Sequence, residues 1–237
     1  MYDKKYDESS IRSENSDFVE FMRPHLGEEK RVVDLGCGTC RKVAKIAPYV
    51  DSVDALDRNE RMLAQAAESL AKKQIDNVRL FLGDNFNTPF ASNTYDVCST
   101  ALSTWSPAEA RRLLKTGGTF FIETLCPDDK FEIKKAFGQD ELGERGYLFG
   151  QTCEERIYYL RTALEAFFEV EEWLFTERQT TLTEEGFLGL LELTPTIRGF
   201  SLEKDGDIVK RLLVDGKVRF TEKRMMIRAT ASRFKPS

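Results

Sequence analysis

A regular alternation of apolar strands and helical segments between residues 31 and 124 constrains the fold most. Strands are expected at 31–35, 52–57, 78–82, 95–100 and 119–124. Helices are expected between them, at 41–47, from Asn59 onward and at 107–114. The pattern predicts an α/β fold, a mostly parallel sheet with helices on both faces. After Cys126 a helix is expected at 154–168, a strand at 169–181, a helix at 186–193 and a last strand at 218–232.

The chain length favours one elaborated domain over two domains. At 237 residues it exceeds a typical domain of about 150 residues, yet no linker divides it. We therefore expect a single domain over 1–237 with three additions to the sheet. These are an N-terminal cap region at 1–30 and substrate-side insertions at 127–150 and 182–216.

Composition excludes several kinds of chemistry. The single histidine, His25, disfavours a Ser-His-Asp triad and the histidine-rich metal sites, so no metal site is expected. The net charge of −5 disfavours a nucleic-acid partner. The polar N-terminus and the absence of a long apolar run predict a cytoplasmic protein with no membrane partner. Five cysteines, an odd number, are expected to be free thiols.

The stretch from Val32 to Thr39 predicts a ligand site. An apolar strand runs into a turn that contains Gly36 and Gly38, and a helical segment follows. Glycines at such a turn let the backbone approach a ligand beyond the carboxyl ends of the strands. A dinucleotide site needs a third glycine for close helix packing, but Arg41 stands there. The sequence therefore favours a cofactor without phosphates.

Four segments in order resemble the class I S-adenosylmethionine-dependent methyltransferases. They are Asp34-Leu35-Gly36-Cys37-Gly38, the acidic Asp57 at the end of the second strand, Gly83-Asp84-Asn85, and Leu114-Lys115-Thr116-Gly117-Gly118. Two departures are Cys40, where a third glycine is frequent, and Thr116, where proline is usual.

This resemblance implies a Rossmann-like, doubly wound sheet of seven strands with an antiparallel last strand, and S-adenosylmethionine as cofactor. Asp57 would accept both ribose hydroxyls, since a carboxylate has two acceptor oxygens. Asp34, Gly36 and Gly38 would shape the methionine site, and Asp84 and Asn85 would lie by the adenine. The full set of cofactor-binding candidates is Asp34, Gly36, Cys37, Gly38, Asp57, Arg58, Asp84, Asn85, Phe86 and Thr100.

The acceptor is expected to be a small molecule. The segment Ser99–Trp105 lacks the Asn/Asp-Pro-Pro-Tyr/Phe motif of amide and adenine methylation, and it resembles the small-molecule and quinone branch of the family. Substrate candidates are Tyr6, Trp105 and Arg198, and Arg198 would hold a carboxylate. Methyl transfer needs a general base only for a poor nucleophile, so no catalytic residue is assigned.

Several alternatives stay open from sequence. Five apolar residues either line an acceptor pocket or form ordinary core: Phe187, Leu190, Leu191, Trp105 and Phe149. The basic segment 217–235 is either a solvated or protected edge strand or a contact for RNA or an acidic carrier. Cys37 and Cys40 are either small residues in a cofactor turn or a redox pair. The rival functions are a methyltransferase acting on tRNA or a carrier-bound carboxylate, and a non-catalytic cofactor-binding module. The chain is expected to be a monomer or a homodimer.

Overall fold

The computed structural model describes residues 17–232, which divide into two compact units. The core unit comprises 17–124, 158–174 and 225–232, and the extension unit comprises 125–157 and 175–224. Helix α7 (Cys153–Glu165) and strands β8 (Phe168–Thr183) and β9 (Lys217–Ala231) have several residues in each of the two units. The single domain expected over 1–237 stays a prediction.

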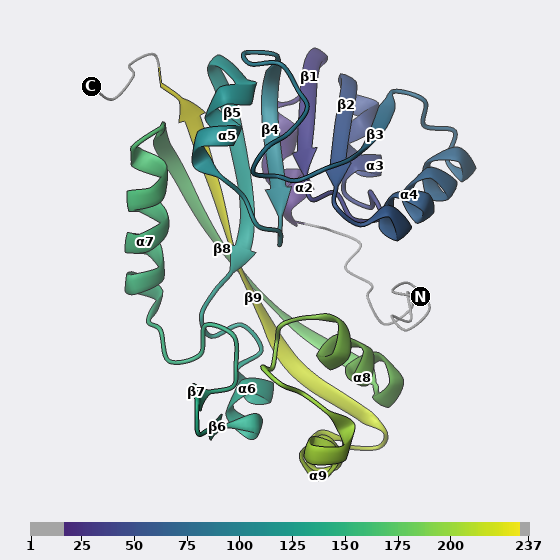
Figure 1. Cartoon of the computed structure of the whole chain (residues 1–237), viewed down its shortest axis with the longest axis vertical. Coiled ribbons are helices and arrows are strands. Elements are labelled where there is room, and N and C mark those ends of the chain that lie inside the picture. The colour runs from purple at the N-terminus through teal and green to yellow at the C-terminus, as the bar shows by residue number, and fades with distance from the viewer. Residues whose placement is uncertain (1–16, 233–237) are drawn as a thin grey trace. The chain divides into compact units, whose positions relative to one another are not determined.

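A seven-stranded sheet with the order β3-β2-β1-β4-β5-β9-β8 organises the fold (Figure 1). Strands β1 (Gly27–Leu35), β2 (Val50–Asp57), β3 (Val78–Leu82), β4 (Tyr95–Ala101) and β5 (Leu114–Leu125) are parallel. The last strand, β9, is antiparallel, which confirms the predicted Rossmann-like sheet. Since β9 lies between β5 and β8, the interpretation of its segment as an edge strand is wrong.

Helices cover both faces of the parallel strands. Buried residues of α2 (Asp17–Met22), α3 (Val43–Ile46) and α4 (Glu60–Lys72) share one cluster with Val32, Val53 and Phe121. Helix α5 (Pro107–Leu113) lies on the opposite face (Figure 1). Two 3₁₀ turns, η1 (Arg23–His25) and η2 (Ala47–Tyr49), precede β1 and β2. Helix α4 begins where the sequence predicts, because the Asn59 side chain accepts from two backbone N–H groups.

The extension unit has a hydrophobic core of its own. Helices α6 (Phe131–Phe137), α8 (Glu184–Leu193) and α9 (Leu202–Leu212) pack with the outer halves of β8 and β9. A small hairpin joins β6 (Gln139–Asp140) to β7 (Gly143–Glu144). Residues Phe187, Leu190 and Leu191 are buried in this core, so the ordinary packing interpretation holds for them. Helix α9 was not predicted from the sequence. Within residues 17–232, no helix is long and apolar enough to span a membrane.

Candidate functional site

The carboxyl ends of β1, β2 and β3 meet at one edge of the sheet. Parallel register aligns Leu35 with Leu56, and Asp57 with Leu82. Beyond the strands, the backbone N–H of Gly36 donates to the Leu56 carbonyl at 2.8 Å, and the Gly83 N–H donates to the Asp57 carbonyl at 3.1 Å. The loops that carry the sequence-predicted motifs are therefore joined to one another at this edge.

The turn after β1 has a conformation that requires glycine. Gly36 and Gly38 have φ values of 82° and 53°, in the left-handed region. An ideal Cβ built on Gly38 meets no atom within 4 Å, so a ligand can approach the backbone there. Such a cradle fits a cofactor that lies against the main chain.

Asp57 is built into this turn. One carboxylate oxygen accepts from the Gly38 N–H at 2.8 Å, and the other accepts from the Asn59 N–H at 2.8 Å. Each carboxylate oxygen offers two acceptor sites, so both retain one for a ligand hydroxyl. The geometry fits the ribose role expected of Asp57. Arg58, the next residue, is exposed.

Asp34 is a buried carboxyl next to the turn. It accepts a hydrogen bond from the Ser99 hydroxyl of the neighbouring strand β4. Burial raises the pKa of Asp34 from 3.8 to about 6, against the opposing effects of Ser99 and the positive charge of Lys42. Lys42 itself forms an ion pair with Glu123 at the end of β5.

This raised pKa predicts a pH dependence of stability. Folded Asp34 binds its proton more tightly than the unfolded chain does, so its contribution to the free energy of unfolding falls as the pH rises from about 4 through about 6. The variant Asp34→Asn lacks this titration. Urea denaturation should show that Asp34→Asn gains stability relative to wild type between pH 4.5 and pH 7.5.

Asp96 provides a control of opposite sign. Burial raises its pKa, but hydrogen bonds from the Lys115 side chain and the Arg31 backbone outweigh burial and lower it. Ionised Asp96 therefore stabilises the fold at neutral pH, and this stabilisation is lost as the pH falls through the lowered pKa of Asp96. Asp96→Asn should lose stability relative to wild type as the pH rises over the acid range. If the stability difference from wild type changed with pH in the same direction for both variants, the raised pKa would not belong to Asp34.

The loop after β3 carries the expected adenine-side residues. The Asp84 carboxylate accepts from the Phe86 N–H at 3.0 Å and so closes a tight turn. The Phe86 ring is 54% exposed, which leaves a face free to stack on a planar group. The Asn85 amide instead donates to the Ser103 hydroxyl at 3.2 Å and to the Thr104 carbonyl at 2.8 Å. It therefore ties this loop to the loop after β4.

The remaining candidate site residues of the core unit differ in burial and in the contacts that they make. Thr100 is fully buried and its hydroxyl donates to the Leu35 carbonyl at 2.9 Å, so it positions the turn through the backbone. Trp105 is half-buried and packs edge-on against Phe120 with ring centroids 5.7 Å apart. Cys37 is half-buried within the turn. Tyr6 lies outside the described residues.

The sequence missed four polar residues around the turn: Lys42, Ser99, Ser103 and Glu123. Lys42 directly precedes α3, whereas the other three belong to β4, the loop after it and β5. No motif marks these three, because their roles depend on the pairing of β1 with β4 and of β4 with β5.

Arg198 lies in the extension unit and binds a carboxylate of its own chain. Its guanidinium donates to Asp140 at 2.7 Å and to the Gly143 carbonyl at 3.1 Å. These bonds fasten the β6–β7 hairpin to the segment before α9. Because one guanidinium nitrogen makes both contacts, Arg198 has other donors for a ligand, and its substrate role stays a prediction.

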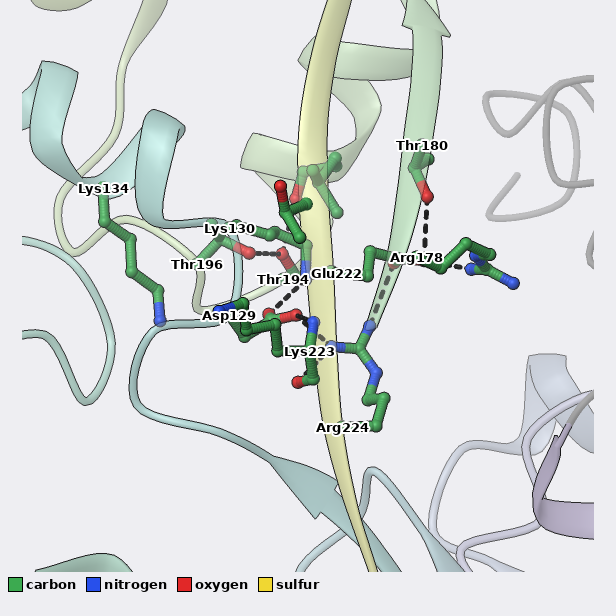
Figure 2. A network of polar contacts seen from close by, with 12 residues as sticks. Asp129, Lys130, Lys134, Arg178, Thr180, Thr194, Thr196, Glu222, Lys223 and Arg224 are labelled. Atoms are coloured by element: carbon green, nitrogen blue, oxygen red, sulfur yellow. Dashed lines mark hydrogen bonds and ion pairs between the residues drawn. The ribbon is translucent and has the colours of Figure 1, made fainter. Parts of the chain in front are cut away.

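Two neighbouring cations of β9 in the extension unit, Lys223 and Arg224, are ion-paired. Figure 2 shows Asp129 beside Lys130 and Arg224, and the Lys130–Asp129 distance is 2.6 Å. Arg224 also pairs with Glu222 at 2.9 Å, and Lys223 pairs with Asp128 at 2.7 Å. In the core unit, Arg228 pairs with Glu171 and Glu172. This neutralisation leaves little free positive charge on the middle of β9 for an acidic partner.

A buried amine lies near this network. The Lys134 side chain is 1% exposed and donates to the Pro127 carbonyl at 3.0 Å. Burial lowers the pKa of Lys134 to about 8. In residues 17–232, no group of three or more His, Cys, Asp or Glu side chains is arranged to hold a metal ion.

Comparisons with known proteins find a methyltransferase domain in this chain. Residues 32–118 match the family described as methyltransferase domain. The biotin biosynthesis bifunctional protein BioHC of Saccharophagus degradans is 30% identical over 184 residues, which cover 72% of this chain and 32% of that protein. The malonyl-[acyl-carrier protein] O-methyltransferase of Erwinia pyrifoliae is 33% identical over 129 residues, 51% of this chain and 46% of that enzyme. The chain thus spans less than half the length of these curated relatives.

Solved structures show the same fold. The structure of a SAM-dependent methyltransferase from Aquifex aeolicus superposes with a TM-score of 0.56 and 16% identity, and the match covers 98% of each chain. The sheet order, the glycine turn and the acidic end of β2 define an α/β domain of the kind that binds a nucleoside cofactor. The match over residues 32–118, together with this fold, supports a class I S-adenosylmethionine-dependent methyltransferase.

Proposed function

We propose that this chain transfers a methyl group from S-adenosylmethionine to a small-molecule acceptor. The main support is the hydrogen bond that the Gly38 N–H donates to the Asp57 carboxylate, which joins Asp57 to the glycine turn. This bond places a carboxylate with spare acceptor capacity directly beside an open stretch of backbone. Such an arrangement suits a ribose diol whose substituent extends along the turn.

The charges around the turn suit the cofactor as well. The carboxylates of Asp34 and Asp57 lie near each other, since each raises the pKa of Cys37. A sulfonium cation is favoured beside carboxylates, whereas a pyrophosphate is not. When bound, the cofactor supplies an electrophilic methyl group, and transfer is an in-line displacement.

The protein's own residues bind and orient the reactants. The glycine turn and Asp57 hold the cofactor side, and the loop after β4 borders the turn at Ser103. Holding two reactants in line accounts for much of the rate that such an enzyme needs. The ring of His25 packs against that of Phe121, with ring centroids 5.5 Å apart. No general base is assigned to the reaction.

Calorimetry with S-adenosylhomocysteine tests the cofactor part of the proposal. Wild type should bind it, and Asp57→Ala should weaken binding by about 1–3 kcal/mol, the value expected for lost hydrogen bonds to a charged group. Asp51→Ala is a matched control, since Asp51 is an exposed carboxylate at the other end of β2. Failure of the wild type to bind would remove the basis of the proposal.

A carrier-bound carboxylate is the second candidate acceptor. It is favoured by the malonyl-[acyl-carrier protein] O-methyltransferase relative and disfavoured by the ion pairing of Lys223, Arg224 and Arg228. A screen with methyl-labelled cofactor against metabolites, carrier proteins and tRNA separates the candidates. Label in a small-molecule fraction supports the first proposal, and label only in carrier protein or tRNA supports a rival. Binding without transfer to any pool would favour a non-catalytic module.

A further inference from the structure

Helix α5 anchors the loop that follows β3. Glu109 of this helix is 8% exposed. One of its carboxylate oxygens accepts from the Thr88 backbone N–H at 2.9 Å and from the Thr88 hydroxyl at 2.7 Å. Hydrogen bonds to a charged acceptor are stronger than those between neutral groups, and this acceptor is shielded from water. The loop therefore has a fixed point two residues after Phe86.

Arg112, one turn further along α5, extends this anchor along the loop. Its guanidinium donates to both Glu109 oxygens, at 2.6 and 2.8 Å. Another of its nitrogens donates to the Phe90 carbonyl at 2.7 Å and to the Ser92 hydroxyl at 3.3 Å. Hydrogen bonds from Arg112 and then Thr88 outweigh burial and lower the pKa of Glu109 to about 2. The anchor therefore stays charged at neutral pH.

The local sequence of α5 points the Glu109 side chain elsewhere. The segment 106–109 has the Ser-x-x-Glu pattern of a capping box, in which the glutamate reaches back to the first residue of its own helix. The Ser106 hydroxyl does accept from the Glu109 N–H, at 3.3 Å. The Glu109 carboxylate, however, lies on Thr88 and Arg112. The same glutamate thus serves the loop after β3 as well as the start of α5.

The exposed Phe86 ring is held between fixed points on both sides. Before it, the Asn85 amide donates to the Thr104 carbonyl at 2.8 Å. After it, beyond Thr88, the Phe90 ring packs edge-on against Phe81 with ring centroids 4.8 Å apart. The Phe86 ring itself is 54% exposed. An aromatic ring on a backbone fixed in this way loses little conformational entropy when it stacks on a planar group.

We propose that Glu109 is a positioning residue for cofactor binding, which through Thr88 holds Phe86 where its ring stacks on the planar base of the cofactor. This inference rests on the proposed function. The Phe86 ring makes the contact, and the Glu109 carboxylate fixes the backbone that carries the ring. Glu109 acts through this loop alone, because its oxygens are engaged by Thr88 and Arg112.

A double-mutant cycle on S-adenosylhomocysteine binding tests this role, because it measures whether two residues act through each other. Calorimetry on the full chain should show that Phe86→Ala weakens binding about tenfold, within the range for the loss of one base–aromatic stack. Glu109→Gln should weaken it about fivefold, since a neutral amide holds Thr88 and Arg112 less strongly. The double variant should bind about as Phe86→Ala does, whereas independent effects would give a loss of about fiftyfold.

Asp96→Asn is the matched control for loss of stability in the core unit. Asp96 is also a carboxylate paired with a cation, Lys115, at 2.7 Å, but it lies at the amino end of β4. Removing its charge should lower stability at neutral pH and leave S-adenosylhomocysteine affinity within about twofold of wild type. A purely structural role of Glu109 would give this same pattern.

The outcomes separate this inference from the proposed function. Absence of S-adenosylhomocysteine binding by wild type contradicts the proposed function itself. Wild-type binding that either Phe86→Ala or Glu109→Gln leaves unchanged overturns only the positioning role. Multiplied losses in the double variant also overturn it, since they indicate that the two residues act separately. If Glu109→Gln does not fold, Arg112→Lys keeps the positive charge but lacks the planar fork, and it should show the same coupling to Phe86→Ala.

Discussion

Replacement of Asp205 by alanine is expected to destabilise the protein by about 3–5 kcal/mol, the usual cost of removing one partner of a buried ion pair. Asp205 lies in α9 and is 1% exposed, and its carboxylate accepts two hydrogen bonds from Arg145 at 2.7 and 2.8 Å. Arg145 is itself 3% exposed and also donates to the carbonyls of Arg198 and Gly199. Asp205→Ala leaves this buried guanidinium with only the more distant Asp140 carboxylate, 3.9 Å away, as a counter-charge.

Urea denaturation measures the loss, and Asp207→Ala is the matched control on the same helix. Asp207 pairs with Lys210 at 3.6 Å in full solvent exposure, so its removal should change stability by less than about 0.5 kcal/mol. The hydrogen bonds from Arg145 hold the pKa of Asp205 below its ordinary value. Its contribution is therefore present at neutral pH and is lost as the pH falls through the lowered pKa, so the gap between Asp205→Ala and wild type should narrow in acid. If Asp205→Ala and Asp207→Ala lost similar amounts of stability at pH 7, the buried Arg145–Asp205 pair would not be an important source of stability.

Gly36→Ala is expected to destabilise the protein by about 2–5 kcal/mol, from a left-handed alanine together with overpacking. The φ of 82° disfavours any side chain, and the new methyl group would meet the Ser103 Oγ at 2.1 Å. The loop after β4 must move to relieve this contact. S-adenosylhomocysteine binding should be lost together with stability.

Gly38→Ala separates backbone strain from steric contact. Gly38 also has a positive φ, 53°, but an added Cβ would meet no protein atom within 4 Å. Its loss of stability should be about 1–2 kcal/mol, the cost of the left-handed conformation alone. Urea midpoints of the two variants give the comparison. A Gly36→Ala variant as stable as Gly38→Ala would show that the turn and Ser103 are not in close contact.

The parallel half of the fold follows from local patterns. Short apolar strands bounded by polar turns predict β1 to β5, and the Asn59 side chain caps α4 as its position indicates. The glycine turn was also predicted from its own residues, because a left-handed turn favours glycine. The ribose role of Asp57 came from the family resemblance and stays a prediction.

The extension unit shows where local patterns fail. Asp205 and Gly206 form a dipeptide typical of a turn, yet they lie inside helix α9. The helix persists there because Arg145, 60 positions earlier in the chain, binds the buried Asp205 carboxylate. Local propensity carries no information about such a partner.

The fold class, the glycine turn and the acidic residue at the end of β2 follow from the sequence alone. Each depends on neighbours in the chain, so periodicity and spacing reveal it. The tertiary structure was needed to show that Lys223, Arg224 and Arg228 are ion-paired and that Ser103 lies over Gly36. These contacts join segments that are distant in the sequence but adjacent in the fold. Local sequence patterns carry no information about such neighbours.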